Sequence, residues 1–218
     1  MQEYVPTAPF GWDPLWVSTI VLILSYAVII SERVNRVVAA LLGAGIMGAL
    51  GILNQHESIK GVDFNTLSLL IGMMAIVGIT RQSGVFQYVA IWTAKKVRGE
   101  PRLLLAALFA VTAVFSALLD NVTTVMLVVP VTIALTQRLR IPLYPFLFSQ
   151  IFASNIGGTA TLIGDPPNIM IGSAAKLSFM DFVYNVGPPS VLAAVLAAVF
   201  FDFFWGRKMS ADQKAQQA

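Results

Sequence analysis

The chain has 218 residues, of which 57% are hydrophobic and only 11% are charged, and its mean hydropathy is +0.77. Soluble domains carry about 25% charged residues, so the composition excludes an ordinary soluble protein and predicts an all-α integral membrane protein. The net charge of +3 does not indicate a nucleic-acid partner, because the basic residues lie in short loops between apolar runs. The absence of cysteine excludes disulfides, thiol catalysis and thiolate metal sites.

Three apolar runs in the first part of the chain predict membrane spans, at 15–31, 37–53 and 64–80. Residues 1–14 contain no Lys or Arg and therefore lack the basic start of a signal peptide, so we expect the first run to stay in the mature protein. Residues 85–97 mix apolar and basic types, which predicts an amphipathic helix lying along the membrane interface.

Other motifs are weaker. Gly43, Gly45 and Gly48 match a dinucleotide fingerprint in letters, but they lie inside an apolar span, so helix packing through small residues is the better interpretation. His56 has no second ligand at metal spacing and reads as a surface residue. No Ser-His-Asp set, HExxH or Walker motif is visible, so we do not expect an enzyme.

A polar interruption at Asp120-Asn121 separates the apolar runs 103–119 and 122–135. The second run has 14 residues, or about 21 Å at 1.5 Å per residue, whereas a hydrocarbon core of about 30 Å needs closer to 20 residues. Two legs that meet at a polar tip, one of them short, predict a re-entrant hairpin. The first leg alone could also cross the membrane.

A second interruption follows in a Gly- and Pro-rich stretch. Residues 145–156 are apolar but too few to cross, 157–168 are not expected to remain regular helix, and 169–175 resume the apolar pattern. This predicts one span broken in mid-membrane. The alternative is a polar extramembrane loop, but neither flank could then cross the bilayer. Residues 186–205 form the last predicted span, and a polar tail follows from Gly206.

Basic residues predict the orientation. With the N-terminus outside, the inside segments hold 12 of the 14 Lys and Arg residues and the outside segments hold 2. The expected architecture therefore has about five crossings plus a re-entrant hairpin and a discontinuous helix, in the cell (inner) membrane, with the C-terminus cytoplasmic. Because five is odd, a second copy of such a unit would be inverted, as in many secondary transporters.

The hairpin tip carries a carboxylate, an amide and two hydroxyls, from Asp120, Asn121, Thr123 and Thr124. Charges are expensive inside a membrane and usually mark a site for something polar. The alternative is that Asp120 or Asn121 simply caps a helix at a membrane-exposed turn.

The broken span carries more polar groups, and its glycines would let the backbone turn and a ligand approach closely. Oxygen atoms from freed carbonyls and from side chains could form the shell that hard cations take. The glycines in question are Gly157 and Gly158, and the side-chain oxygens would come from Thr159, Thr161, Asp165 and Asn168.

Residues 116–135 and 153–174 closely resemble the ArsB/NhaD permeases of the ion-transporter (citrate-transporter-like) superfamily. The tip Leu119-Asp120-Asn121 is similar to the hairpin tip of that family, and Gly164-Asp165-Pro166-Pro167-Asn168 resembles the end of its unwound loop.

The resemblance implies one cation and substrate site, with Na⁺ or H⁺ as the coupling ion and no cofactor. Sodium ligands would come from Asp120, Asn121, Asn155 and Asp165. It also implies an elevator-type movement, with 103–140 (hairpin) and 141–176 (discontinuous helix) as transport domain, 1–102 as scaffold and interfacial helix, and 177–218 as last span and tail.

Family members have two such repeats, and this chain contains one. We therefore expect one half of an inverted-repeat secondary transporter, of the sodium/proton antiporter or anion-permease type, which acts on a small ion or anion within lipid. It would work as a homodimer or with a second-repeat partner. Two alternatives remain: an arsenite or di/tricarboxylate permease, and a non-transporting membrane subunit that needs a second half.

Overall fold

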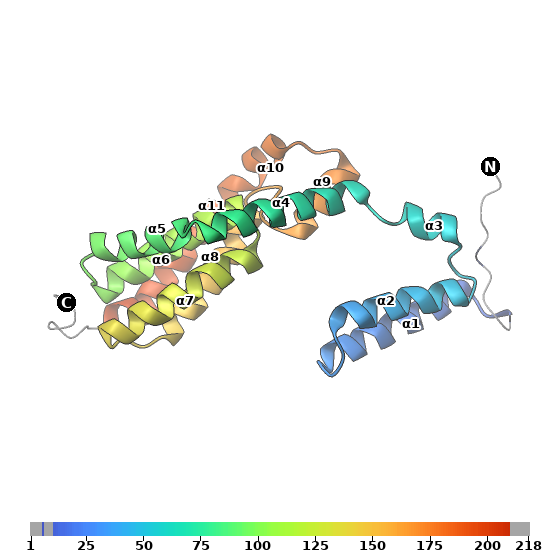
Figure 1. Cartoon of the computed structure of the whole chain (residues 1–218), viewed down its shortest axis with the longest axis horizontal. Coiled ribbons are helices and arrows are strands. Elements are labelled where there is room, and N and C mark those ends of the chain that lie inside the picture. The colour runs from blue at the N-terminus through green and yellow to red at the C-terminus, as the bar shows by residue number, and fades with distance from the viewer. Residues whose placement is uncertain (1–5, 7–10, 210–218) are drawn as a thin grey trace. The chain divides into compact units, whose positions relative to one another are not determined.

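The computed structural model describes residue 6 and residues 11–209, and this part of the chain is helical, with no β-strand among the described residues (Figure 1). The all-α prediction is therefore confirmed. The chain divides into two compact units, Met1–Asp63 and Phe64–Ala218. Most of the N-terminal segment predicted to lie outside, and residues 210–218 of the predicted tail, fall beyond the described residues.

The first unit contains two apolar helices that pack against each other, α1 (Pro14–Ile30) and α2 (Arg36–Ala49). Each begins at a side-chain cap, because Asp13 accepts a hydrogen bond from the Leu15 N–H and Asn35 accepts one from the Val37 N–H. Both helices are shorter than 18 residues.

Glycine in α2 matters at one position only. A Cβ atom on Gly43 would collide with the Ser25 hydroxyl of α1, whereas a Cβ on Gly45 would meet nothing within 4 Å. Packing through small residues is thus observed at Gly43, and the other glycines of the motif do not share it.

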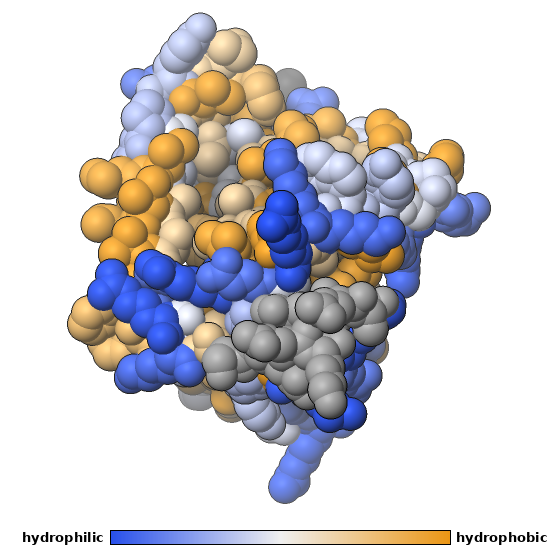
Figure 2. All heavy atoms as spheres, turned by 90° about the vertical axis from the view of Figure 1, so that its left-hand side faces the viewer, coloured by the Kyte–Doolittle hydropathy of each residue, from blue (hydrophilic) through white to orange (hydrophobic). Residues whose placement is uncertain are grey.

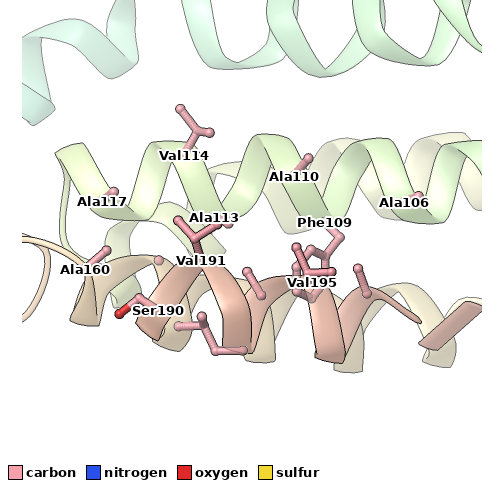
Figure 3. Close-up of a pocket in the computed structure, with 14 residues that line it drawn as sticks. Ala106, Phe109, Ala110, Ala113, Val114, Ala117, Ala160, Ser190, Val191 and Val195 are labelled. Atoms are coloured by element: carbon pink, nitrogen blue, oxygen red, sulfur yellow. The ribbon is translucent and has the colours of Figure 1, made fainter. Parts of the chain in front are cut away.

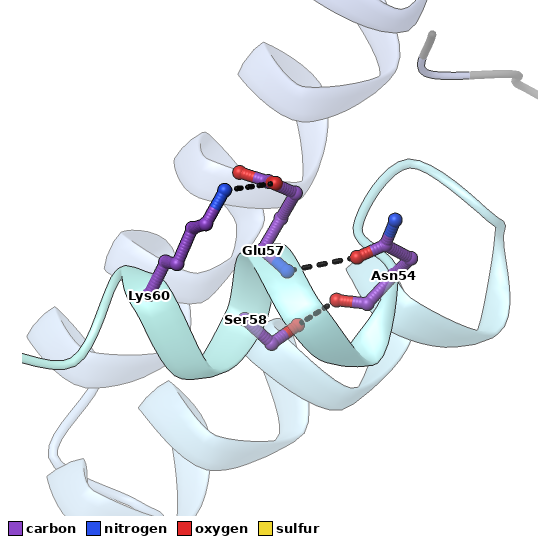
Figure 4. Close-up of polar contacts among 4 residues, drawn as sticks. All are labelled: Asn54, Glu57, Ser58 and Lys60. Atoms are coloured by element: carbon purple, nitrogen blue, oxygen red, sulfur yellow. Dashed lines mark hydrogen bonds and ion pairs between the residues drawn. The ribbon is translucent and has the colours of Figure 1, made fainter. Parts of the chain in front are cut away.

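A short helix that sequence reasoning missed, α3 (Gln55–Lys60), follows within the predicted polar loop. Figure 4 shows its polar contacts: Asn54 accepts from the Glu57 N–H at 2.8 Å, Ser58 donates to the Asn54 carbonyl, and Lys60 pairs with Glu57 at 3.1 Å. The N-cap and the ion pair stabilise this short helix, which the polar sequence did not predict.

The second unit contains eight α-helices and a terminal 3₁₀ turn among its described residues. In chain order they are α4 (Phe64–Gln82), α5 (Val85–Lys96), α6 (Pro101–Leu118), α7 (Asn121–Leu139), α8 (Tyr144–Thr159), α9 (Pro166–Ala175), α10 (Phe179–Asn185), α11 (Gly187–Phe204) and η2 (Gly206–Lys208). The short helix α10, which begins at a capping box of Ser178 and Asp181, was not anticipated from the sequence.

Helix α8 lies at the centre of this unit, since it packs against α6, α7 and α11. Its buried face presents Phe146 and Ala153, both with no exposed surface, to Leu104 and Leu108 of α6 and to Phe201 of α11. Apolar burial of this kind is what holds the three helices to α8.

The last span is also tied to α6 by charge. Arg102 donates from Nε and Nη2 to the two carboxylate oxygens of Asp202, at 2.5 and 2.7 Å, and Arg207 of η2 approaches the same carboxylate at 3.5 Å. The predicted polar tail therefore begins with a structured turn, in which Gly206 is buried against Asp202 and Arg102.

The predicted interfacial helix is α5, and it packs along α6 and α7. Phe86, Ala90, Thr93 and Ala94 are its buried residues, and the Phe86 ring meets Phe115 of α6 edge to face, with centroids 5.1 Å apart. The helix is thus part of the helical bundle of the second unit, while its position relative to the bilayer stays a prediction.

Among the described residues, four helices are long and apolar enough to cross a membrane, namely α4, α6, α7 and the continuous stretch from α11 into η2. This confirms a multi-pass architecture, although the number of crossings stays a prediction. The expected short second leg of the hairpin was wrong: α7 has 19 residues, or about 28 Å, because it continues to Leu139. Length therefore no longer favours a re-entrant hairpin over two full spans. Pro130 lies inside α7 at an exposed position.

The predicted helix break was placed too early. Helix α8 runs through Gly157 and Gly158 and ends at Thr159, so the non-helical stretch is 160–165. Gly157 instead allows α8 to approach α6 closely. A Cβ on Gly157 would collide with the Ala113 carbonyl oxygen and lie 2.8 Å from the Ala113 Cα of α6.

We expect Gly157→Ala to destabilise the second unit by about 1–3 kcal/mol, because the atoms that a methyl group would strike are backbone atoms of α6. Thermal unfolding of the detergent-solubilised chain, followed by near-ultraviolet circular dichroism, measures the change.

Gly78→Ala is the matched control. Gly78 lies in α4, and a Cβ there meets nothing within 4 Å, so this substitution should stabilise the same unit by up to about 1 kcal/mol. Equal effects of the two substitutions would show that α6 and α8 do not approach as closely as described.

Candidate functional site

The hairpin tip consists of two residues between α6 and α7. Leu119 ends α6 in an extended conformation, and Asp120 caps α7 by accepting a hydrogen bond at Oδ2 from the Thr123 N–H at 2.9 Å. The capping interpretation of Asp120 is therefore realised in the structure. One carboxylate oxygen makes this bond, which leaves the other for a ligand.

The break between α8 and α9 is the second interruption. Pro166 begins α9, and Asp165 stands at its N-cap position, but the Asp165 side chain makes no capping hydrogen bond. The two acidic residues thus differ: Asp120 holds the start of a helix, while the Asp165 carboxylate is not used for that purpose.

Asn168 closes the break from inside α9. Its side-chain nitrogen lies 2.9, 3.3 and 3.4 Å from the carbonyl oxygens of Thr161, Gly158 and Thr159. These carbonyls belong to the last turn of α8 and to the loop that follows it. The predicted site residue Asn168 therefore supports the loop through its amide nitrogen.

Three hydrogen bonds near the tip join the hairpin to the broken span. The Asn121 side chain donates to Asn155 Oδ1 at 3.2 Å, and Ser116 donates to the Ser154 carbonyl at 2.6 Å. Thr161 donates to the carbonyl of Ala117 at 2.6 Å, near the end of α6. Two polar stretches that are far apart in the sequence are thereby held side by side.

The same arrangement brings the acidic side chains together, since Asp120 and Asp165 lie close enough for their charges to interact. Both are half-buried, as are Asn121, Thr123 and Asn168. Asn155 and Thr159 are exposed on the surface of the unit, and Thr159 donates to the Asn155 carbonyl at 2.8 Å. The predicted ligands therefore meet at a partly open place.

Close backbone contact makes this meeting possible. A Cβ on Gly158 would lie 2.6 Å from the Gly164 carbonyl oxygen, and a Cβ on Gly164 would lie 2.7 Å from the carbonyl oxygen of Ser116. Both glycines are buried. Any side chain at either position would push the loop away from the hairpin.

Buried hydroxyl and amide groups were the part of this region that sequence reasoning missed. Ser116 and Gln150 have no exposed surface, and Gln150 donates to Thr132 at 2.6 Å, which links α8 to α7. Thr124, a predicted site residue, is fully buried, and its hydroxyl has no hydrogen-bond partner among the described residues. Small polar residues in otherwise apolar helices were the available signal.

A separate apolar groove of about 350 Å³ lies between α6, α8 and α11. Figure 3 shows alanine side chains of α6 facing Val191 and Val195 of α11 across it. Its one hydroxyl, on Ser190, already donates to the Val186 carbonyl at 2.8 Å. The groove carries no charge and does not suit an ion.

The candidate ligands for a cation are thus two carboxylates and two amides. Among the described residues, no group of three or more His, Cys, Asp and Glu side chains could hold a metal ion. A site with Asp120, Asn121, Asn155 and Asp165 would be of the all-oxygen kind that suits sodium.

Comparison with known proteins places the chain among membrane transporters. The chain matches the citrate transporter family over residues 26–217. A 46 kDa membrane protein of Mycobacterium leprae is 50% identical over 182 residues, covering 81% of this chain and 42% of the relative. An uncharacterized transporter of Mycobacterium tuberculosis is 44% identical over 204 residues, covering 91% of this chain and 48% of the relative.

The human P protein is more distant, at 37% identity over 204 residues, covering 88% of this chain and 24% of that protein. The chain spans a little under half the length of the mycobacterial relatives it matches. The resemblance stated from the hairpin tip and the Gly-Asp-Pro-Pro-Asn loop is confirmed by these matches. This chain is a multi-pass membrane protein that belongs to the citrate transporter family, a family of transporters and not of enzymes.

Proposed function

We propose that this chain forms one half of a cation-coupled secondary transporter, with the coupling ion bound between the hairpin tip and the break of the discontinuous helix. The observation that carries the proposal is that two separate interruptions, one with Asp120 and one with Asp165, are held together by the Asn121–Asn155 and Thr161–Ala117 hydrogen bonds. Acidic residues held together within a membrane-spanning bundle typically bind sodium or protons.

Helix ends support the same proposal. Helices α6 and α8 end at this place, and α7 and α9 begin there. Helix C-termini present carbonyl oxygens that favour a cation, whereas helix N-termini present N–H groups that favour an anion. One site could then bind a coupling cation and an anionic substrate next to each other.

The site residues indicate the substrate less directly than the coupling ion. The name of the matching family favours citrate or a related carboxylate, and an arsenite permease is the other anion reading. No Lys or Arg stands between Arg102 and Arg138 or between Arg140 and Lys176, so an anion would depend on helix ends and on the bound cation. A sodium/proton exchange reaction needs no such anion and is the simplest activity for the two acids.

The transport movement is proposed as elevator-like, with the hairpin and α8–α9 moving together. The hydrogen bonds between them support counting them as one body, and the packing of α11 on α8 supports adding α11 to it. We further propose that the chain works as a homodimer or with a second repeat, in the cell membrane with its N-terminus outside. The competing proposal is a non-transporting subunit.

We expect Asp165→Asn and Asp120→Asn each to reduce sodium-dependent proton exchange by about 10- to 100-fold, because a hydrogen-bonded charge contributes about 1.5–3 kcal/mol. Asparagine caps a helix about as well as aspartate, so Asp120→Asn removes the charge and keeps the Thr123 bond. Everted vesicles loaded with sodium or lithium measure the exchange.

Asp13→Asn is the control, since Asp13 also caps a helix and lies in the first unit. Exchange that survives the double substitution at 120 and 165 would contradict the proposed cation site. If a well-inserted wild-type chain shows no exchange, the same variants are to be compared with a second repeat present, and equal activity there would contradict the proposal. Citrate in the external buffer tests the carboxylate alternative.

We expect Asn155→Ala to raise the sodium concentration for half-maximal exchange by about fivefold, because the variant loses one hydrogen bond of about 1 kcal/mol between the hairpin and α8. Asn155 also donates to the Ile151 carbonyl at 2.9 Å within its own helix.

The exposed Asn185 of α10 offers a matched control, since it donates in the same way to the Asp181 carbonyl at 2.8 Å within its own helix. Asn185→Ala should leave the sodium dependence unchanged. Equal shifts in both variants would show that the Asn121–Asn155 bond does not shape the site.

A further inference from the structure

One end of the second unit carries an unusual concentration of positive charge. Helices α5, α7 and α11 end there and α6 begins there (Figure 1). Figure 2 looks onto this end, where hydrophilic residues gather beside exposed apolar side chains. The described residues at this end include two acids, Glu100 and Asp202, and eight exposed basic residues: Lys95, Lys96, Arg98, Arg102, Arg138, Arg140, Arg207 and Lys208.

One of the two acids is shared. Asp202 accepts both hydrogen bonds from Arg102 and is also approached by Arg207. A single carboxylate therefore serves two guanidinium groups, one on α6 and one on η2. The corner where α5 turns into α6 has one acid of its own, Glu100, which is outnumbered by the basic residues Lys95, Lys96 and Arg98.

The backbone of that corner is strained at a basic residue. Arg98 has φ of 53°, in the left-handed region that glycine and asparagine adopt more readily. Gly99 follows with φ of 66°, and its N–H donates to the Ala94 carbonyl at 3.1 Å to close the end of α5. The arginine side chain does not stabilise the turn itself, because glycine or asparagine would adopt this conformation at a lower cost.

Apolar side chains lie directly beside these charges on α5. Lys96 sits over the Trp92 ring, 4.9 Å from its centroid, and Trp92, Ile91 and Tyr88 are exposed by 50%, 43% and 68%. Tryptophan and tyrosine are typical of the membrane–water interface. The surface thus offers cations and an apolar strip next to each other, which matches an amphiphile with a negative headgroup.

We propose that the corner formed by Lys95, Lys96 and Arg98, together with Trp92, binds the phosphate headgroup of an anionic phospholipid, with its acyl chains along the exposed face of α5. A free phosphate ion would make no contact with the apolar strip. A zwitterionic lipid has no net charge and would be attracted much less strongly to the basic residues. Basic residues near a membrane surface each strengthen binding of anionic lipid. The site is independent of the proposed ion exchange.

The test compares the wild-type chain with the triple variant Lys95→Gln, Lys96→Gln and Arg98→Asn, both purified in detergent. Phosphatidylglycerol is titrated in, and bound lipid is counted by native mass spectrometry while thermal unfolding is followed in parallel. The wild-type chain should bind phosphatidylglycerol and be stabilised by it, and the variant should bind it roughly 100-fold more weakly.

The variant should also fold, because asparagine relieves the left-handed strain at position 98; its unfolding temperature without lipid checks this. Lys176→Asn is the matched control. Lys176 caps α9 in the same left-handed conformation, with φ of 55°, away from this corner, and its loss should not change lipid binding.

Three results would overturn the proposal. The first is an unchanged phosphatidylglycerol affinity in a folded triple variant. The second is equal stabilisation of the wild-type chain by phosphatidylcholine. The third is the same shift with inorganic phosphate alone, which would assign the corner to a soluble anion. None of these readouts involves transport, so they stand apart from the exchange assays.

Discussion

A helix that is interrupted inside a membrane leaves backbone N–H and C=O groups without partners, and each such group costs several kcal/mol in hydrocarbon. The break between α8 and α9, which we predict to lie within the membrane, meets this constraint with side chains. The Asn168 amide contacts three carbonyls of the break, and the Thr161 hydroxyl accepts from the Gly164 N–H while it donates to the end of α6. Because one of these partners belongs to the hairpin, the break can persist only with the hairpin beside it. The two parts of the candidate site are therefore one structural feature.

Close approach of α6 and α8 is what allows such short links. Gly157 removes the side chain that would strike the Ala113 backbone, and the buried Ser116 then reaches the Ser154 carbonyl. Further from the tip, large apolar side chains such as Phe146 and Leu104 fill the same interface. The bundle is thus tight and polar near the interruptions and apolar toward the basic end. This gradient places the residues that we propose as ion ligands at one end of a firmly packed core.

The long helices α1, α2, α4, α6 and α11 could be predicted from hydropathy, since each corresponds to one apolar run. The short helices α3 and α10 could not, because their stability comes from caps and one ion pair within polar sequence. The start of the break was misplaced because Gly157 and Gly158 were interpreted as helix breakers. They are helical, and their lack of a side chain allows close contact with neighbouring backbone. The candidate site residues were found as polar groups in apolar sequence. The pairing of Asn121 with Asn155 depends on how α8 passes the hairpin, which local patterns do not encode.

Pro130 lies midway along α7, ten residues from Asp120. A proline has no N–H, so it cannot donate to the Met126 carbonyl, and the bending stiffness of the helix is lowest there. On one side of this point the helix carries the tip, and on the other side Thr132 is bonded to Gln150 of α8. Any opening of the tip would pivot at the proline. The half of α7 beyond the proline would stay in register with α8 through the Gln150–Thr132 bond, so the strain of such a movement would fall on the Asn121–Asn155 bond at the tip.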